Sequence, residues 1–162
     1  MLPSELIAKT HELSKALRKK KLRLATAESC TGGLISMAMT EIPGASDVFE
    51  RGFVTYSNES KIELLTVPTF YIEEYGAVSM EAAIAMAEGA LLMSKADISV
   101  SVTGCAGPDG GTAEKPTGTV FIGCAIKNHS TVYERFLFSG NRHAIRIKST
   151  EAAFNLLLKC LD

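Results

Sequence analysis

The sequence predicts an α/β fold in which helices cover both faces of one five-stranded, mostly parallel sheet. The first indication is alternation, because apolar segments with strand character are separated by segments with helical periodicity. The second is a pair of β-rich segments at 119–126 and 131–138, whose short connection makes a hairpin and so gives one antiparallel strand. The third is size: 162 residues, of which 46% are hydrophobic, fill one core, so residues 1–162 are expected to form one domain.

The first half of the chain is expected to contain three helices and two strands. Residues 4–20 carry apolar side chains on one helical stripe and end in a basic run, which suits the negative end of a helix dipole. A short strand at 22–26 follows, and helical character resumes at 34–40. A second strand is expected at 52–56, and it leads into a short helix at 58–65.

The second half adds a long helix, the remaining three strands and a C-terminal helix. Residues 66–76 are expected to be irregular, with no more than one helical turn. An Ala- and Met-rich helix at 80–95 precedes a β-branched, apolar segment at 98–103, which is typical of a buried strand. Residues 104–118 contain five glycines and two prolines, which indicates a long loop. After the hairpin strands, residues 141–161 predict the last helix.

Composition and charge argue against several classes of protein. Seventeen Lys and Arg against 18 Asp and Glu give a formal charge of −1, which does not favour a nucleic-acid binder with a basic face. No apolar run approaches the roughly 18 residues of a membrane span, and the N-terminus lacks the features of a secretory signal. The four cysteines form no CxxC pair and the three histidines stand apart, so no zinc site is expected. We therefore expect a cytoplasmic protein with reduced thiols and no bound metal.

Ligands in such sheets bind beyond the carboxyl ends of the strands, so the loops after the first three strands are candidate sites. The first of these loops contains Ser29, Cys30, Thr31, Gly32 and Gly33 at a strand-to-helix turn. Free N–H groups at this helix N-terminus could hold an anion, or the oxyanion that forms when a nucleophile attacks a carbonyl. Two alternatives stay open: Ser29 and Thr31 only cap the helix, or Cys30 is the nucleophile, because helix N-termini lower thiol pKa values.

A serine nucleophile needs a base, and Lys61 is the best placed candidate. It lies in the first turn of the helix after the second strand, where the helix dipole and burial both lower the pKa of an amine. A neutral amine could accept the Ser29 proton, with Tyr56 donating or relaying a hydrogen bond. The histidines lie outside the three loops. The alternatives are an exposed helix lysine and a tyrosine that only packs at a strand end.

The third loop is rich in glycine, which lets backbone N–H groups approach a ligand closely. It includes Gly104, Gly107 and Gly110, but their spacing does not match the dinucleotide-binding fingerprint. Arg142 and Arg146, one helical turn apart in the last helix, could add positive charge toward a phosphate. Solvated helix arginines are the alternative.

Four motifs in this order resemble the C-terminal domain family of CinA, and more closely its stand-alone PncC-type nicotinamide-nucleotide amidases. The motifs are 26–33 (TAESCTGG), 51–61 (RGFVTYSNESK), 76–79 (GAVS) and 103–111 (TGCAGPDGG), the last followed by 115–120 (KPTGTV). The likeness covers essentially the whole chain. Three departures from the family pattern touch no proposed catalytic group: Ser60, Cys105 and Thr117.

The resemblance implies a three-layer α/β/α sandwich around a mixed five-stranded sheet. It also implies hydrolysis of the carboxamide of nicotinamide mononucleotide to nicotinate mononucleotide and ammonia. It maps the nucleophile to Ser29 and completes the catalytic group with Tyr56 and Lys61. No metal and no cofactor are implied, and members of the family tend to be dimers or larger. The N-terminal domain of full-length CinA proteins is expected to be absent.

The other predicted site residues bind the substrate. Backbone N–H groups from Cys30 to Gly32 are expected to hold the oxyanion, and a glycine-rich loop is expected to bind the 5′-phosphate. The predicted substrate-binding set is Cys30, Thr31, Gly32, Gly33, Thr103, Gly104, Gly107, Gly110 and Arg142. Two other functions stay open: an amidohydrolase or phosphatase for a different small molecule, and a catalytically silent module that binds a nucleotide or a protein.

Overall fold

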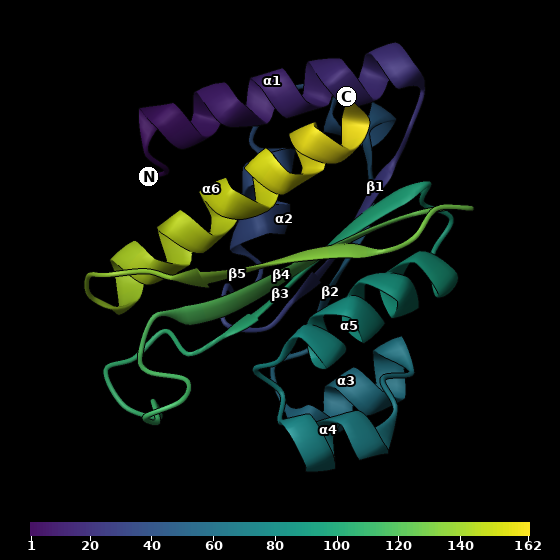
Figure 1. Ribbon diagram of the computed structural model, residues 1–162. Helices are drawn as coiled ribbons and strands as arrows, with labels where there is room; N and C mark the ends of the chain where they lie inside the picture. The colour runs from purple at the N-terminus through teal and green to yellow at the C-terminus, as the bar shows by residue number, and fades with distance from the viewer.

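Five strands form one sheet in the computed structural model, which describes residues 1–162 (Figure 1). They are β1 (Leu24–Glu28), β2 (Phe49–Val54), β3 (Ile98–Gly104), β4 (Thr119–Ile126) and β5 (Val132–Leu137). Their order across the sheet is β2-β1-β3-β4-β5, and β1 pairs in parallel with both β2 and β3. β4 is antiparallel to both of its neighbours, so it alone runs against the other strands. The predicted mixed, mostly parallel sheet is therefore confirmed.

Six helices cover the two faces of this sheet and complete the three expected layers (Figure 1). On one face lie α1 (Ser4–Lys20), α2 (Leu34–Thr40) and α6 (Arg142–Leu161). On the other face α5 (Met80–Leu92) contacts the sheet, and α3 (Asn58–Leu65) and α4 (Thr69–Tyr75) pack against α5. None of these helices combines the length and the apolar character that crossing a membrane requires.

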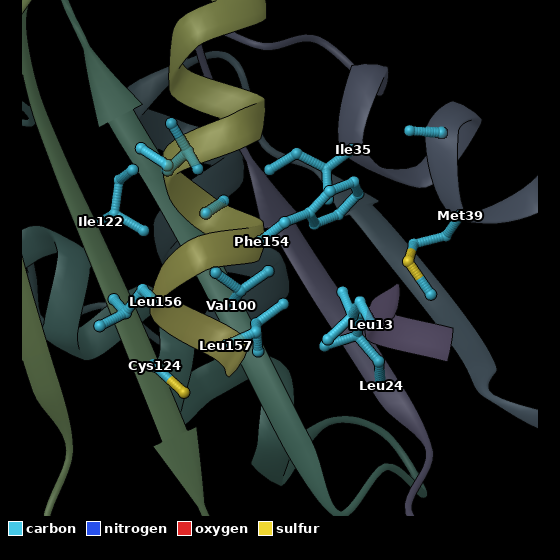
Figure 2. Close-up of a cluster of buried hydrophobic side chains, with 14 of the residues drawn as sticks. Leu13, Leu24, Ile35, Met39, Val100, Ile122, Cys124, Phe154, Leu156 and Leu157 are labelled. Carbon is cyan, nitrogen blue, oxygen red and sulfur yellow. The ribbon is translucent and has the colours of Figure 1, made fainter. Parts of the chain in front are cut away.

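The main core lies between the sheet and the layer of α1 and α6 (Figure 2). Leu24, Val100 and Ile122 extend from β1, β3 and β4 into this layer, where they meet Phe154 and Leu157 of α6. Each of these side chains is fully buried. Burial of one such side chain is worth about 1.5–3 kcal/mol, so the cluster holds α6 firmly across the sheet. The start of α6 is thereby fixed at the edge where the candidate site lies.

On the opposite face, small residues let α5 approach the sheet closely. Ser99 and Ser101 of β3 donate hydrogen bonds of 2.5 Å to the carbonyl oxygens of Ala87 and Ala83 in α5. Gly89 leaves room for the last carbonyl of α3, with which any larger side chain would collide. These contacts place α3, and with it the residues that follow β2, against the carboxyl ends of the strands.

The first two strands begin and end at other residues than predicted. β1 occupies 24–28 rather than 22–26, and β2 occupies 49–54 rather than 52–56. The alternation of side chains shows that a strand is present, but pairing decides where it ends. β1 pairs with β3 from Leu24 opposite Ile98 to Glu28 opposite Val102. It pairs with β2 from Leu24 opposite Phe49 to Glu28 opposite Val54, and this register shifts by one residue after Leu24. The first loop of the site therefore starts directly after Glu28.

Two helical boundaries also differ from the prediction. Residues 69–75, expected to be irregular, form the seven-residue helix α4. Its aromatic residues Phe70 and Tyr71 each pack edge to face with Tyr75, and the helix packs on α5, so tertiary contacts stabilise it. α5 ends at Leu92 rather than at residue 95, because the following residues turn toward β3.

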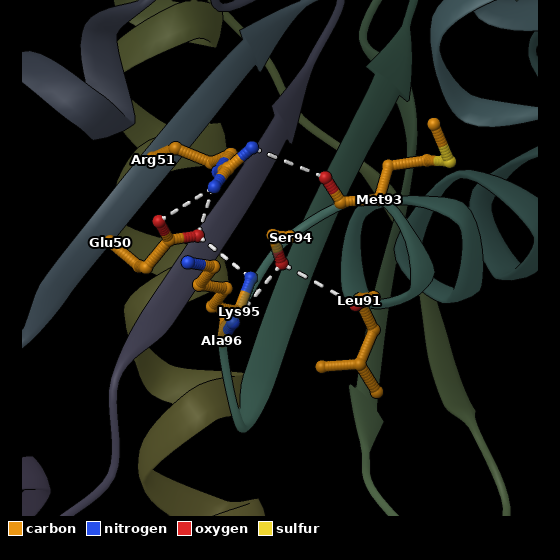
Figure 3. A network of polar contacts seen from close by, with 7 residues as sticks. All are labelled: Glu50, Arg51, Leu91, Met93, Ser94, Lys95 and Ala96. Carbon is orange, nitrogen blue, oxygen red and sulfur yellow. Dashed lines mark hydrogen bonds and ion pairs between the residues drawn. The ribbon is translucent and has the colours of Figure 1, made fainter.

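A polar network ties the edge strand β2 to the connection between α5 and β3 (Figure 3). The Glu50 carboxylate accepts hydrogen bonds from the Arg51 guanidinium at 2.7 and 3.0 Å and from the Lys95 backbone N–H at 3.0 Å. The hydrogen bond from Arg51 lowers the pKa of Glu50. The network lies at the amino ends of β2 and β3, and the opposite ends of these strands carry the candidate site.

Candidate active site

A cleft of about 260 Å³ lies beyond the carboxyl ends of β1, β2 and β3. Its walls come from the segments that follow these strands, from the loop before α5 and from the start of α6. Eight of the predicted site residues line it: Ser29, Cys30, Tyr56, Lys61, Thr103, Gly104, Gly107 and Arg142. Four predicted residues lie outside the lining: Thr31, Gly32, Gly33 and Gly110.

Ser29 and Lys61 are in hydrogen-bond contact in this cleft. Ser29 is the first residue after β1, and its backbone N–H donates to the Val102 carbonyl of β3, which fixes it at the sheet edge. Lys61 lies in the first turn of α3, a helix whose N-cap is Ser57. The Ser29 Oγ and Lys61 Nζ atoms lie 2.9 Å apart, although 32 positions separate the two residues in the sequence.

The Lys61 amine is held in a polar pocket that lacks a carboxylate. The residue is only 1% exposed, and its Nζ lies 2.7 Å from the Thr55 carbonyl oxygen and 3.1 Å from that of Tyr56. Burial lowers the pKa of Lys61 from 10.5 to about 8. A neutral amine has two N–H donors and one lone pair, which match the two nearest carbonyl acceptors and one hydroxyl donor; a third carbonyl, that of Ser57, lies farther away at 3.5 Å. The arrangement therefore suits transfer of the Ser29 proton to Lys61.

The side chain of Tyr56 lies apart from this pair. It is 59% exposed, and its hydroxyl oxygen accepts a hydrogen bond of 3.0 Å from Arg142 Nη2. Only the Tyr56 backbone carbonyl contacts Lys61. The prediction that this hydroxyl bridges Ser29 and Lys61 is not what the structure shows. The reason is that the side chain extends toward α6 at the rim of the cleft, where Arg142 binds it.

Cys30 lines the cleft beside Ser29, but its thiol lacks the character of a nucleophile. The residue is 5% exposed, and burial raises the pKa of the thiol to about 11. The positive charge of Arg146 acts in the opposite direction and is the weaker effect. Because the thiolate is the reactive form of cysteine, the expected activation by the helix N-terminus is overcome by desolvation.

The turn after Ser29 leaves one predicted oxyanion donor at the cleft. The N–H of Gly32 donates to the Ser29 carbonyl at 3.0 Å, so it is already occupied, contrary to the prediction. Thr31 is fully buried and does not reach the cleft. The N–H of Cys30 donates to no other residue of the protein, and Cys30 lines the cleft. Its N–H is therefore free to meet a developing negative charge on a bound substrate.

Glu28, the last residue of β1, has a role beside this turn that the sequence did not reveal. It is fully buried at the end of β1. Its carboxylate accepts hydrogen bonds from the N–H groups of Ile35 and Ser36 at 2.8 and 3.0 Å, and from the Ser36 hydroxyl at 2.7 Å. These donors begin α2, whose N-cap is Gly33, without a side chain of its own. Glu28 therefore caps α2. In the sequence analysis, Ser29 and Thr31 were the alternative candidates for this role.

The glycine-rich loop after β3 forms the facing wall of the cleft. Gly107 has a φ of +79°, and the Thr117 side chain fills the space that a side chain at 107 would need. The N–H groups of Ala106 and Gly107 donate to no group of the protein. Arg142 Nη1 donates to the Gly107 carbonyl at 2.8 Å. This wall thus offers free N–H donors and one guanidinium to an anion.

The remaining predicted residues support the cleft from its edges. The Thr103 hydroxyl donates to the Ala77 carbonyl at 2.7 Å and so anchors the loop before α5. This loop lines the cleft, although no site residue was predicted in it. Asn58 and Asp109 also line the cleft but were not predicted as site residues, although both belong to the quoted motifs. No group of three or more His, Cys, Asp or Glu side chains is arranged to hold a metal ion.

Several named proteins are similar to this chain. An Enterobacter agglomerans protein named nicotinamide-nucleotide amidohydrolase PncC is 50% identical over 145 residues, which are 90% of this chain and 87% of that protein. The Escherichia coli K12 protein of the same name is 43% identical over 157 residues, 97% of this chain and 95% of that protein. A protein of Caldicellulosiruptor bescii, described as competence-damage inducible, is 52% identical over 143 residues. Those residues are 88% of this chain, but the chain spans only 34% of that relative.

Solved structures agree with the sequence comparison. The crystal structure of the competence/damage inducible protein CihA from Agrobacterium tumefaciens matches with a TM-score of 0.97 and 39% identity. The match covers 100% of this chain and 99% of that chain. The family model described as the CinA C-terminal domain matches residues 7–161. With its sheet, its helical layers and nearly its whole length matched, this chain belongs to the CinA C-terminal domain family.

Proposed function

We propose that this protein hydrolyses the carboxamide of nicotinamide mononucleotide to nicotinate mononucleotide and ammonia. The observation that carries the proposal is the contact of 2.9 Å between the Ser29 hydroxyl and the buried Lys61 amine. The names of the E. agglomerans and E. coli relatives, which this chain matches over most of their length, point to the same reaction. A nucleophile with an adjacent base is what attack on an unactivated amide requires.

The reaction is proposed to proceed through an acyl-enzyme. Ser29 Oγ attacks the amide carbonyl while Lys61 accepts its proton, and the Cys30 N–H donates to the oxyanion. Lys61 then gives the proton to the amide nitrogen as the C–N bond breaks, and ammonia leaves. Water attacks the ester, Lys61 takes a proton from it, and Ser29 recovers its hydroxyl as the C–O bond breaks. No cofactor takes part in these steps.

The wall formed by the glycine-rich loop is proposed to bind the 5′-phosphate. Its free N–H groups at Ala106 and Gly107 and the Arg142 guanidinium suit an anion of this kind. Tyr56 takes part by holding Arg142 at the rim through its hydroxyl, rather than by relaying the Ser29 proton. A cytoplasmic location and assembly into a dimer or larger oligomer stay predictions.

Release of ammonia from nicotinamide mononucleotide tests this function directly. The purified protein should produce ammonia and nicotinate mononucleotide in equal amounts, without added metal. Nicotinamide, asparagine and glutamine serve as amides that lack the nucleotide, and phosphate release is followed in parallel. Ammonia from another amide alone would favour a different amidohydrolase, phosphate release would favour a phosphatase, and no turnover of any compound would favour a binding module.

The pH dependence of the reaction should report the ionisation of Lys61. Because the neutral amine is the base and its pKa is about 8, kcat/KM is expected to rise about tenfold per pH unit below about pH 7, to be half-maximal near pH 8 and to level off above about pH 9. Initial rates of ammonia release between pH 6 and 9.5 at constant ionic strength measure this profile. A rate that is independent of pH from 6 to 9 would contradict the assignment of Lys61 as the base.

A further inference from the structure

The guanidinium of Arg146 binds the turn that carries the nucleophile. Arg146 Nε donates to the Cys30 carbonyl at 3.1 Å, and Nη2 donates to the Thr31 carbonyl at 2.9 Å. The residue is half-buried in α6, and it is absent from the lining of the cleft, whereas Ser29 and Cys30 line it. Arg146 therefore contacts the turn from outside the cleft and does not serve as the phosphate ligand that the sequence suggested.

The Cys30 carbonyl depends on this contact. It accepts a hydrogen bond from Arg146 only, while the Thr31 carbonyl also accepts from the Leu34 N–H at 3.1 Å. Cys30 is 5% exposed and Thr31 is fully buried, so water is a poor substitute for the guanidinium. A buried carbonyl that loses its donor costs about 1–3 kcal/mol, and rotation of the peptide group would relieve that cost.

The peptide group that Arg146 holds directly follows the one that carries the oxyanion donor, and the two groups meet at the Cα atom of Cys30. The Cys30 N–H belongs to the preceding peptide group, whose other end, the Ser29 carbonyl, accepts from the Gly32 N–H. Because peptide groups are planar and trans, the direction of each carbonyl fixes the direction of the N–H in the same group. Two consecutive peptide groups after the nucleophile are thus held, the first within the turn and the second by Arg146.

We propose that Arg146 is a positioning residue that holds the turn after Ser29 so that the Cys30 N–H can donate to the oxyanion. The proposal rests on the serine mechanism of the proposed function. No carboxylate lies within 4.0 Å of the Arg146 guanidinium, so its charge is not paired. The positive charge of Arg146 acts on the turn: it lowers the pKa of the Cys30 thiol, whereas burial raises it. The same positive charge favours negative charge on an oxyanion beside Cys30.

The test compares Arg146→Met and Arg146→Lys with Lys148→Met. Lys148 is a matched control, since it lies two positions further along α6 and its amine donates to the Ser139 carbonyl, away from the cleft. Loss of one oxyanion donor lowers kcat by about 10²–10³-fold. Arg146→Met is therefore expected to lower kcat about 100-fold with little change in KM, while Arg146→Lys recovers part of the loss by binding one of the two carbonyls.

A second measurement makes the test independent of the substrate. A fluorophosphonate forms a Ser29 Oγ–P bond and releases fluoride, and the negative charge on its phosphoryl oxygen needs the same donor. The rate of this labelling should fall by a similar factor in Arg146→Met and stay at the wild-type value in Lys148→Met. Unfolding curves for all variants show that each is folded at the assay temperature.

Each outcome bears on one proposal. Wild-type kcat and wild-type labelling rate in Arg146→Met would overturn the role of Arg146. A loss that appears in KM with kcat unchanged would assign Arg146 to substrate binding and would also overturn it. If the wild-type protein is labelled at Ser29 but releases no ammonia from nicotinamide mononucleotide, the proposed substrate fails, whereas the labelling rates still decide the role of Arg146.

Discussion

Replacement of Ser29 by alanine is expected to lower kcat for ammonia release by about 10⁴-fold or more, with little change in KM and in stability. The side chain provides the atom that bonds to the substrate carbonyl, so the acyl-enzyme cannot form without it. Ser29 is 8% exposed and its hydroxyl contacts Lys61 at the floor of the cleft. Loss of one oxygen at this position leaves the backbone contact to Val102 in place. Steady-state ammonia release and urea unfolding measure the two effects.

Cys30→Ala is the matched control for Ser29→Ala. It removes a buried sulfur from the neighbouring position and leaves the Cys30 backbone N–H in place, so it is expected to keep kcat within a few-fold of the wild type. If Ser29→Ala were as active as the wild type while Cys30→Ala were inactive, the serine mechanism would be replaced by a thiol mechanism. Equal activity of both variants would point to direct attack by water.

Replacement of Lys61 by methionine is expected to lower kcat by about 10²–10⁴-fold, because the general base is lost while the apolar part of the side chain is kept. Lys61 is 1% exposed, so an unbranched side chain of similar length fits the same space. The remaining activity should also lose the rise toward pH 8 that the wild type shows. Initial rates across the pH range, with wild type and variant side by side, measure both effects.

The same variant is expected to change how stability depends on pH. The pKa of Lys61 is about 8 in the folded protein and 10.5 ordinarily, so between these values the unfolded chain binds a proton that the folded chain does not. Below pH 8 the amine is charged in both states, so the full cost of burying the charge lowers the unfolding free energy of the wild type. This cost decreases as the pH rises from 8 toward 10.5. Relative to Lys61→Met, the wild type should gain about 2–3 kcal/mol between pH 7 and pH 10.

Lys61→Met also removes the hydrogen bonds of Lys61, and this loss lowers the unfolding free energy of the variant at both pH values. It therefore cancels when the difference between wild type and variant at pH 7 is subtracted from the difference at pH 10. Urea unfolding at pH 7 and pH 10 gives the two differences in unfolding free energy. Lys19→Met, which removes an exposed amine near the end of α1, is the control and should show no such gain. A difference between wild type and Lys61→Met that stays constant from pH 7 to pH 10 would contradict a depressed pKa at Lys61.

Much of the architecture follows from patterns that are local in the sequence. The hairpin of β4 and β5, the buried strand β3 and the helices α1 and α6 are present at the predicted places within a residue or two. Their signals are strong because the periodicity extends over many residues. β1 and β2 were displaced by two or three residues, and α4 was missed, because strand pairing and packing on α5 decide those boundaries.

Some features of the site also have a local signal in the sequence, whereas others depend on tertiary contacts. The turn at Ser29 and the helix start at Lys61 have recognisable local sequences, and the rule for strand ends places both at one edge of the sheet. The role of Glu28 as the cap of α2, and the two different positions of Arg142 and Arg146, had no such signal. Arg142 lies at the rim with Tyr56, while Arg146 contacts the turn from outside the cleft.

Local patterns in the sequence were sufficient to predict the five strands and five of the six helices in their order, the loops in which chemistry was expected and the residue types that serve there. Three features of the site come from the packing of distant segments: Lys61 is buried without a counter-ion, the Tyr56 hydroxyl binds Arg142, and Arg146 anchors the turn from 116 positions away. The physical reason is that periodicity and turn preferences depend on neighbouring residues. Burial, desolvation and contacts between distant segments depend on how the layers pack around the sheet, and these set the pKa and the hydrogen-bond partners of each group.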